Sequence, residues 1–204
     1  MQNKQANNQA IEGIQLIDTI NLPTAMSSQT KFYLFKDSKD VISVLAKGDV
    51  SGKENVLVRV HSECLFGDLL GSLKCDCGRQ LEKAKKLMKV EPLTLLFYLG
   101  QEGRGIGLKN KVKAYKLQEQ GHDTIDANTL LGFKPDMRSY DSVGKILKQF
   151  FKIDSIRLLT NNPKKIEEIK KAAIAIKQIP LITPSNKHNR KYLTTKKIRF
   201  GHTI

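Results

Sequence analysis

The chain has no long hydrophobic run. None of its 204 residues belongs to a stretch approaching the roughly 18 consecutive apolar residues that a membrane helix needs. The N-terminus also lacks both an apolar signal segment and the Arg- and Ser-rich amphipathic character of a transit peptide. These absences predict a soluble, cytoplasmic protein with no membrane partner. The first dozen residues, MQNKQANNQAIE, are polar and amide-rich, so we expect residues 1–12 to form a flexible N-terminal segment.

Acidic and aromatic residues are both scarce. The chain has 20 Asp and Glu against 35 Lys and Arg, which gives a formal net charge of +15. Such a charge predicts a polyanionic partner, which is a nucleic acid, an acidic surface or a phosphorylated small molecule. A Lys-rich composition shared by a whole proteome would look the same. Because only 6% of the residues are aromatic and no stacking pattern is visible, a zinc-bearing nucleic-acid-binding module is the less favoured interpretation.

Cysteine is rarer still, and its placement is informative. The three cysteines, Cys64, Cys75 and Cys77, all lie in the segment HSECLFGDLLGSLKCDCG. Thiolates suit zinc, and three protein ligands leave a fourth tetrahedral position for water or substrate, as in catalytic zinc sites. His61 as a fourth ligand would instead make a closed structural site. A disulfide is disfavoured because Cys75 and Cys77 are too close to pair with each other. Candidate proton carriers and partners of the ligands lie nearby: His61, Ser62, Glu63, Asp68 and Asp76.

Strand and helix patterns alternate along the chain. Residues 55–61 (NVLVRVH) and 93–99 (LTLLFYL) are typical of strands, and 155–160 (SIRLLT) predict a third. Apolar residues recur at helical spacing over residues 77–89, and further helices are expected from the glycine-rich segment to about residue 120 and from residue 163 to about 172. This alternation predicts an α/β fold, with one domain over residues 13–204. We expect a mixed, mostly parallel sheet flanked by helices and a zinc-bearing loop.

Two turns have sequence features that are typical of phosphate-binding sites. Gly103, Gly105 and Gly107 separate a buried strand from a helix, and exposed backbone N–H groups in such a turn bind anions, with Arg104 adding a guanidinium. Simple tight turns use the same glycines. In the second turn Asn162 and Pro163 suit a helix start, yet lysines follow at positions 164 and 165, where the helix dipole disfavours cations. Either a bound phosphate offsets this mismatch, or the lysines are simply solvated.

In this order, several motifs resemble those of the GTP cyclohydrolase II family. They are VRVHSECLFGD, SLKCDCGRQLE, QEGRGIGL, KAYKLQEQGHDTIDAN, GFKPDMRSY and LLTNNPKK, collinear over residues 58–165, with a weaker match at 199–202. The resemblance implies a homodimeric α/β enzyme that holds one Zn²⁺ per subunit and also needs Mg²⁺. Such an enzyme catalyses the first step of riboflavin biosynthesis. It removes C8 of GTP as formate, releases pyrophosphate, and leaves 2,5-diamino-6-(5-phospho-D-ribosylamino)pyrimidin-4(3H)-one.

The resemblance also implies roles for individual residues. Cys64, Cys75 and Cys77 would bind zinc, in agreement with their clustering. Asp136 would be the proton acceptor, Arg138 the nucleophile of a phosphoryl-transfer step, and Tyr115 a neighbour of the reacting ring. The residues implied to contact GTP are Arg59, Val60, His61, Ser62, Glu63, Gln80, Glu102, Gly103, Arg104, Thr124, Thr160 and Lys165.

The chain departs from the family pattern at two places. Gly100 stands where an arginine usually precedes QEGR, which predicts the loss of a positive charge beside the nucleotide loop. The early segment LPT, residues 22–24, lacks the glycine that usually follows it, and we expect only an edge strand to be affected. An altered paralogue that binds GTP or another purine nucleotide and stops at a formylated intermediate is the alternative function. The basic tail after Ser185 either caps the pocket or keeps the protein soluble.

Overall fold

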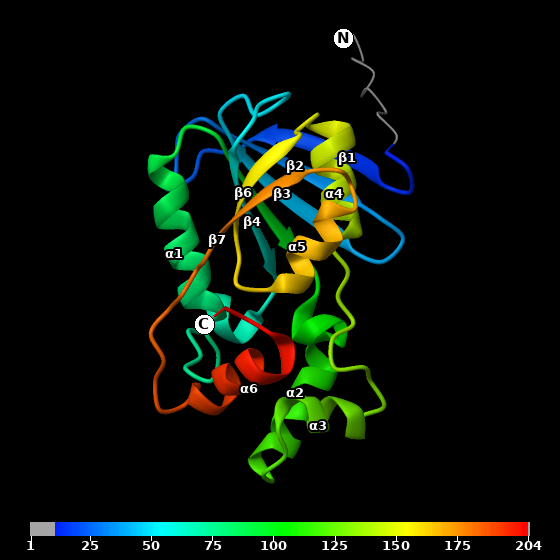
Figure 1. Cartoon of the computed structure of the whole chain (residues 1–204), viewed down its shortest axis with the longest axis vertical. Helices are drawn as coiled ribbons and strands as arrows, with labels where there is room; N and C mark the ends of the chain where they lie inside the picture. Colours follow the sequence, from blue (N-terminus) through cyan, green and yellow to red (C-terminus); the bar gives the residue numbers. More distant parts are fainter. Residues whose placement is uncertain (1–10, 204) are drawn as a thin grey trace.

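A computed structural model describes residues 11–203. The fold is built around a central seven-stranded sheet (Figure 1). The strands are β1 (Gln15–Asn21), β2 (Thr30–Lys36), β3 (Val41–Lys47), β4 (Val56–Ser62), β5 (Thr94–Leu99), β6 (Ser155–Leu159) and β7 (Ala175–Ile179). The α-helices are α1 (Cys77–Val90), α2 (Gly107–Glu119), α3 (Thr124–Leu130), α4 (Asp141–Lys145), α5 (Pro163–Lys170) and α6 (Arg190–Phe200). Three short turns of other helix types are η1 (Leu65–Leu69), η2 (Glu102–Gly105) and η3 (Ile146–Phe150).

The sheet is mixed. Its strand order is β1-β2-β3-β5-β4-β6-β7, with antiparallel pairing from β1 to β5 and parallel pairing from β5 to β7. Strands β2, β4, β5, β6 and β7 therefore run in one direction and β1 and β3 in the other, which confirms the predicted mixed, mostly parallel α/β sheet. The antiparallel half needs only short connections, whereas each parallel step crosses over through helices.

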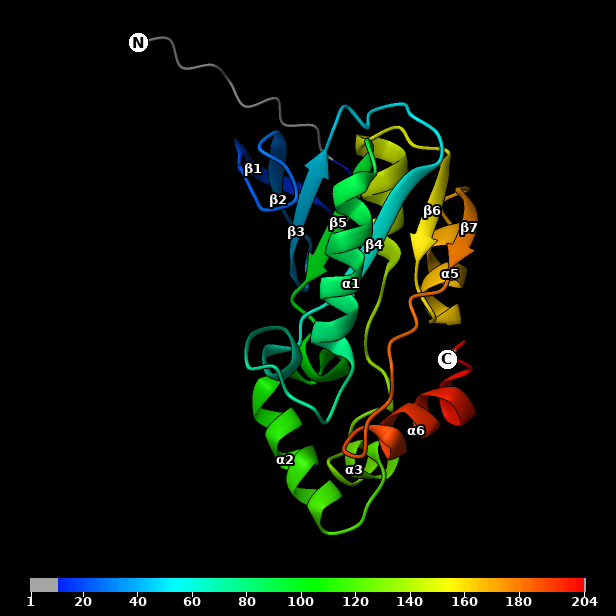
Figure 2. The same cartoon turned by 90° about the vertical axis from the view of Figure 1, so that its left-hand side faces the viewer.

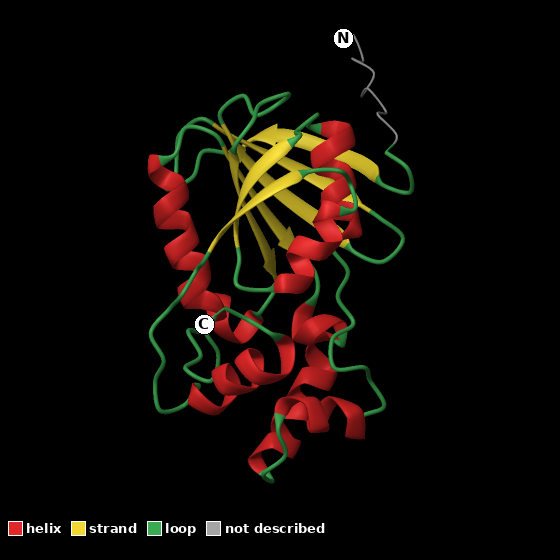
Figure 3. Cartoon of the chain, viewed as in Figure 1, coloured by secondary structure: helices red, strands yellow, loops and turns green. Residues whose placement is uncertain are grey.

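Helices cover both faces of the sheet (Figure 3). On one face, Val58, Leu95 and Phe97 pack with residues of α4, η3 and α5 in the larger core cluster. On the other face, Leu57 and Leu96 pack with residues of α1 in a smaller cluster. Successive residues of β4 and β5 alternate between the two clusters because side chains in a strand point to opposite faces in turn. Both central strands are therefore buried on both sides, as their apolar sequences predicted.

The remaining helices gather beyond one end of the sheet. In Figure 2 the arrowheads of β5, β6 and β7 point toward the end of the molecule where α2, α3 and α6 lie. The carboxyl ends of β4, β5 and β6 thus open into the space between the sheet and these helices. Open α/β sheets commonly place ligand sites at this edge.

The structure confirms the predicted elements around the motifs. The predicted strands at residues 55–61, 93–99 and 155–160 are β4, β5 and β6, and the predicted helices are α1, α2 and α5. The side chain of Asn162 accepts a hydrogen bond from the backbone N–H of Lys164, so it caps α5 as expected. Residues 22–24 follow edge strand β1, in the connection to β2. The expectation of a flexible start falls mainly on residues 1–10, which lie outside the described residues.

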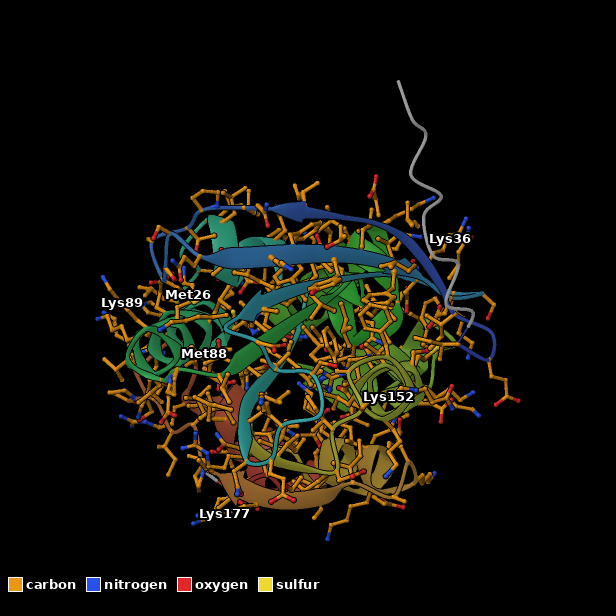
Figure 4. All side chains as sticks on the ribbon, turned by 90° about the horizontal axis from the view of Figure 1, so that it is seen from above. Met26, Lys36, Met88, Lys89, Lys152 and Lys177 are labelled. Carbon is orange, nitrogen blue, oxygen red and sulfur yellow. The ribbon has the colours of Figure 1, made fainter. Side chains whose placement is uncertain are left out.

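The excess of lysine is spread around the molecule. In Figure 4, Lys36, Lys89 and Lys177 lie at different places around the edge of the molecule and Lys152 lies within its outline, whereas Met88 lies in α1 with Met26 beside it. The four lysines are exposed and the two methionines belong to the smaller core cluster. The basic composition therefore does not by itself mark one binding face.

Candidate metal and nucleotide site

A pocket lies at the carboxyl ends of the three central parallel strands. The end of β4 and the loop after it supply His61 to Cys64, the turn after β5 supplies Gln101 to Arg104, and the turn after β6 supplies Thr160 to Asn162. Helices α1, α2 and α6 complete the lining. Segments more than a hundred residues apart in the sequence thus share one cavity, because parallel strands bring their carboxyl ends to one edge.

The three thiols converge at the pocket wall. The Sγ atoms of Cys64, Cys75 and Cys77 lie within 4.8 Å of one another, and those of Cys64 and Cys75 are 3.8 Å apart. A disulfide would hold two sulfurs at about 2.05 Å. Two thiolates on one tetrahedral zinc, each about 2.3 Å from the metal, would be about 3.8 Å apart. The spacing therefore fits a shared metal ion and excludes a disulfide between Cys64 and Cys75.

His61 is engaged elsewhere. Its Nε2 lies 3.0 Å from both carboxylate oxygens of Asp68, and its Nδ1 lies 3.2 Å from a guanidinium nitrogen of Arg59. Among residues 11–203, the group of potential ligand atoms that includes the cysteines has no fourth member. This favours the three-cysteine site with an open position over the closed alternative with His61 as fourth ligand.

Two glycines allow the thiols to approach. A Cβ atom on Gly78 would lie 2.0 Å from the carbonyl oxygen of Gly67, and one on Gly67 would lie 2.9 Å from Sγ of Cys75. The start of α1 therefore packs directly against the backbone of η1. This contact joins the segment that carries Cys64 to the segment that carries the other two cysteines.

The electrostatic surroundings favour ionisation of Cys64. Hydrogen bonds from the thiols of Cys75 and Cys77 lower the pKa of Cys64, against the opposing effect of burial, and Lys111 adds to the shift. The pKa of Cys75 is raised by its hydrogen bonds to Cys64 and Cys77. Nζ of Lys111 lies 3.2 Å from Sγ of Cys64 and 2.7 Å from Oε1 of Glu102. The second oxygen of Glu102 accepts a hydrogen bond from the backbone N–H of Leu65 at 2.6 Å. A buried cation and an ordered carboxylate thus fix the loop that bears Cys64.

A chain of hydrogen bonds connects β4 to the segment that carries Cys75 and Cys77. Arg59 donates to the backbone oxygen of Leu159 at 2.9 Å and to Oε1 of Gln80 at 2.9 Å. Gln80 in turn donates at 2.6 Å to Oδ2 of Asp76, which lies between Cys75 and Cys77.

Burial lowers the pKa of His61, so its imidazole is neutral at neutral pH. Arg59 and His61 share the strand face opposite Val58 and Val60, as a period of two requires.

The glycine-rich turn places Arg104 in the pocket. Gly103 and Arg104 both have left-handed backbone conformations, with φ of 63° and 62°. A Cβ on Gly103 would come within 3.0 Å of Lys111. Within the described part of the chain, the Nη1 and Nη2 atoms of Arg104 are buried and have no hydrogen-bond partner. A guanidinium held in this way has its donors available for an anion.

The second predicted turn adds two buried groups. Thr160 and Lys165 are 1% and 5% exposed, and Nζ of Lys165 donates to the backbone oxygen of Val60 at 2.6 Å. Burial, together with the charges of Arg59 and Arg138, lowers the pKa of Lys165 well below its usual value. The interpretation of Lys165 as a solvated lysine is therefore wrong. Lys164 is more exposed and donates to the backbone oxygen of Arg138 at 2.6 Å.

Asp136 and Arg138 form a bidentate ion pair. Nε and one terminal nitrogen of Arg138 donate to the two carboxylate oxygens of Asp136 at 2.9 and 2.7 Å. Although burial opposes it, this pairing lowers the pKa of Asp136 and contributes to the raised pKa of Arg138. Arg138 lines the pocket and Asp136 lies behind it.

The structure brings most of the sequence-predicted residues together. The cavity is lined by Arg59, His61, Ser62, Glu63, Cys64, Cys75, Cys77, Gln80, Glu102, Gly103, Arg104, Tyr115, Arg138, Thr160 and Lys165. Val60 points into the core and faces the site only through its carbonyl oxygen. Thr124 begins α3, and its side chain lies outside the described part of the structure. Tyr115 packs edge-on against Phe66 with ring centroids 5.5 Å apart.

Gly100 lies just after β5 and two residues before Glu102. It lines a hollow with Asp37 and Asp40 that is also lined by Glu102 and Arg138, and it is absent from the lining of the pocket with the thiols. A Cβ at this position would meet only the backbone oxygen of Val41, at 3.7 Å. An arginine in place of Gly100 would therefore add a positive charge beside the turn that carries Glu102 and Arg104, and the expected effect of its loss stays a prediction.

Several lining residues had no distinguishing signal in the sequence. Lys111 is one lysine among many in α2, and only its distance to Cys64 separates it from its neighbours. Tyr192, Lys196, Phe200 and His202 come from the basic tail, for which capping of the pocket was one of two interpretations. Their presence in the lining supports the capping interpretation.

Comparison with known proteins gives a consistent result. A family model described as GTP cyclohydrolase II matches residues 15–180. The chain is 46% identical over 191 residues to a GTP cyclohydrolase-2 of Picrophilus torridus, covering 93% of this chain and 98% of the relative. It is 48% identical to a GTP cyclohydrolase-2 of Saccharophagus degradans, covering 93% and 95%. A riboflavin biosynthesis protein RibBA of Staphylococcus saprophyticus is 46% identical over 91% of this chain and 47% of its own length. Within residues 11–203, no helix is long and apolar enough to cross a membrane.

Proposed function

Because the chain belongs to the GTP cyclohydrolase II family, we propose that it opens the imidazole ring of GTP. The reaction releases formate and pyrophosphate and gives 2,5-diamino-6-(5-phospho-D-ribosylamino)pyrimidin-4(3H)-one, the first step of riboflavin biosynthesis. The observation that carries the proposal is the shared pocket. Three thiols at metal-binding distance line the same cavity as the cations Arg104, Arg138 and Lys165.

The proposed cofactors are zinc and magnesium. Cys64, Cys75 and Cys77 would hold one Zn²⁺ per subunit, which when bound supplies an ionised water at neutral pH. Lys111 and the backbone N–H of Gly67 both donate to Cys64, which stabilises its thiolate form. Magnesium is proposed at the phosphate end, where pyrophosphate leaves.

Neighbouring side chains suit the proton transfers of ring opening. Tyr115 lines the pocket beside the thiols, and burial together with the charge of Cys75 raises the pKa of its hydroxyl. It therefore stays protonated and is able to donate a hydrogen bond to the purine ring. Burial and the charge of Glu102 raise the pKa of Glu63, which lines the pocket beside Cys64 and is proposed to take part in proton transfer. Gln80, oriented by Arg59 and Asp76, offers an amide to the base.

At the phosphate end, Arg138 is proposed as nucleophile and Asp136 as proton acceptor. A bond would form between a guanidinium nitrogen of Arg138 and the α-phosphorus while the bond from that phosphorus to pyrophosphate breaks. The guanidinium proton would pass to Asp136 along the existing hydrogen bond. The ion pair that defines this route also holds the proton on Arg138. Water would then cleave the bond between Arg138 and phosphorus, which would regenerate the arginine and leave the 5-phosphoribosyl group of the product.

The protein is proposed to act in the cytoplasm as a homodimer. Leu69, Leu70 and Leu73, which lie in and just after η1, are 74%, 65% and 56% exposed in the single chain. Apolar side chains of this kind are typical of subunit interfaces. The mass of the particle in solution, measured by light scattering during size-exclusion chromatography, tests this assignment.

The decisive assay is incubation of the zinc- and magnesium-loaded protein with GTP. Formate, pyrophosphate and the pyrimidine product are measured together, with Cys75→Ser as the matched variant that loses a metal ligand. Equal amounts of all three products are expected from the parent protein, and neither formate nor the pyrimidine from the variant. Pyrophosphate without formate would mean that the reaction stops early, and the absence of any product would refute the proposed activity.

A further inference from the structure

Helix α6 lies beyond the carboxyl ends of the central strands (Figure 2), and its residues Tyr192, Lys196 and Phe200 line the pocket. Lys191 donates to the backbone oxygen of Gly121 beyond α2 at 3.2 Å, and the backbone N–H of Thr203 donates to the backbone oxygen of Asn161 at 3.1 Å. Nζ of Lys196 lies 2.6 Å from Oδ1 of Asp76, between Cys75 and Cys77. The C-terminal segment thus contacts three separate parts of the structure around the pocket.

Two aromatic rings of α6 hold Arg104. The guanidinium carbon lies 4.5 Å from the ring centroid of Phe200 and 5.8 Å from that of Tyr192. These contacts with the ring faces replace a carboxylate partner, because Nη1 and Nη2 of Arg104 have no hydrogen-bond partner among the described residues. A guanidinium ordered by stacking keeps its hydrogen-bond donors free.

Lys196 is held in a similar way. Its Nζ lies 4.6 Å from the ring centroid of Tyr192, and its side chain is only 12% exposed. Its one acidic partner, Asp76, is shared, because the other carboxylate oxygen accepts a hydrogen bond from Gln80. The charge of Lys196 also contributes to the lowered pKa values of Lys165 and His202, which places all three groups close together.

The cations in this pocket outnumber the acids that neutralise them. Lys196 pairs with Asp76 and Arg138 with Asp136, whereas Arg59, Arg104 and Lys165 have no carboxylate within ion-pair distance in the described chain. Buried cations without counter-ions are costly unless an anion binds among them. The unpaired cations lie on β4, η2 and α5, and α6 adds Lys196 beside them.

We propose that α6 is a wall of the nucleotide site, in which Lys196 binds the phosphate chain of the substrate and Phe200 is a positioning residue that orients Arg104 toward the same anion. This inference rests on the proposed function for the identity of the substrate, a nucleoside triphosphate. It extends the site beyond the motifs that the sequence placed in it. On this view, Lys196 exchanges its bond to Asp76 for one to the substrate.

The first test measures binding of inorganic tripolyphosphate to the zinc-loaded protein by calorimetry. Lys196→Met is compared with Lys197→Met, which removes an exposed charge from the same helix. We expect Lys196→Met to weaken binding about tenfold or more, as for loss of a charge-assisted hydrogen bond, and Lys197→Met to change it less than about twofold. Lys196→Arg should restore most of the affinity. Equal effects of the two Met variants would overturn the proposal.

The second test separates positioning from packing. Phe200→Leu should raise KM for GTP several-fold with little change in kcat and with full zinc content, and Phe200→Tyr should restore KM. A fall in kcat alone, or no rescue by tyrosine, would overturn the role of Phe200.

If Lys196→Met fails to fold or loses zinc, the role of Lys196 is tested in the parent protein. Its lysines are acetylated chemically with and without tripolyphosphate. Tripolyphosphate should protect Lys196 and leave Lys197 unprotected, and equal protection would overturn the role of Lys196. A parent protein that binds tripolyphosphate through Lys196 but releases no formate from GTP would refute the proposed function alone. GTP turnover that is indifferent to Lys196→Met would refute only this inference.

Discussion

Gly78→Ala is expected to destroy the metal site without altering a ligand. By helix propensity alone, alanine in place of glycine in α1 would stabilise the protein by about 0.5–1 kcal/mol. The tertiary contact has the opposite effect. The new Cβ would lie 2.0 Å from the carbonyl oxygen of Gly67, whereas ordinary contact begins at 3.4 Å, so the two backbones must separate by about 1.4 Å (3.4 − 2.0).

That displacement is large for a metal centre. Metal–ligand distances tolerate deviations of only about 0.2 Å, and the Gly67–Gly78 contact sets the spacing between Cys64 and the other two cysteines. We therefore expect Gly78→Ala to lower zinc affinity about 100-fold or more, and ring opening to fall with it. Overpacking of this kind also costs about 1–3 kcal/mol of stability.

Zinc content by mass spectrometry, chelator competition and formate release measure this effect. The matched control is Gly100→Ala, because Gly100 has no positive φ and its Cβ would meet only the backbone oxygen of Val41, at 3.7 Å. The control should keep zinc and activity. A folded Gly78→Ala protein with parental zinc affinity would refute the argument that this backbone contact sets the thiol geometry.

Four further outcomes are expected. Gly100→Arg should lower KM for GTP, because position 100 lines a hollow with Glu102 and Arg138 and the new guanidinium would add a positive charge beside the nucleotide turn; an unchanged KM would contradict this expectation. Lys165→Met should raise KM about tenfold while leaving thermal stability equal or higher, since it relieves repulsion among buried cations; a lower melting temperature with unchanged KM would contradict the phosphate role. Arg138→Ala should abolish pyrophosphate release with zinc retained, and release at the parental rate would exclude the nucleophile role. Asp136→Asn should be less stable than the parent at pH 7 in urea unfolding. Because the pKa of Asp136 is lowered in the folded state, its contribution is present above pH 3.8 and fades as the pH falls below that value, so a stability difference that persists undiminished in acid would contradict the ion pair.

The sequence by itself determined the local elements and pointed to three thiols as candidate metal ligands. Strand β4 and helices α1 and α5 follow from periodicity and from capping by Asn162, because these signals depend on neighbours along the chain. The three cysteines were recognisable because thiols are scarce and clustered. The roles of Asp136, Arg138 and Tyr115 came only from the family resemblance, because two charges on a loop and one tyrosine in a helix carry no spacing signal.

Tertiary structure alone decided that two further lysines, Lys111 and Lys196, line the pocket. Lys111 lies against Cys64 and Lys196 against Asp76, across 47 and 120 residues of sequence, and nothing in their local context distinguishes them from other lysines. It also decided that Gly78 packs against the backbone of Gly67 with no room for a Cβ. The physical reason is the same in each case. Contacts between distant segments depend on how the parallel strands and their crossovers bring those segments to one edge of the sheet, whereas periodicity along the chain reports only which side of its own element a residue occupies.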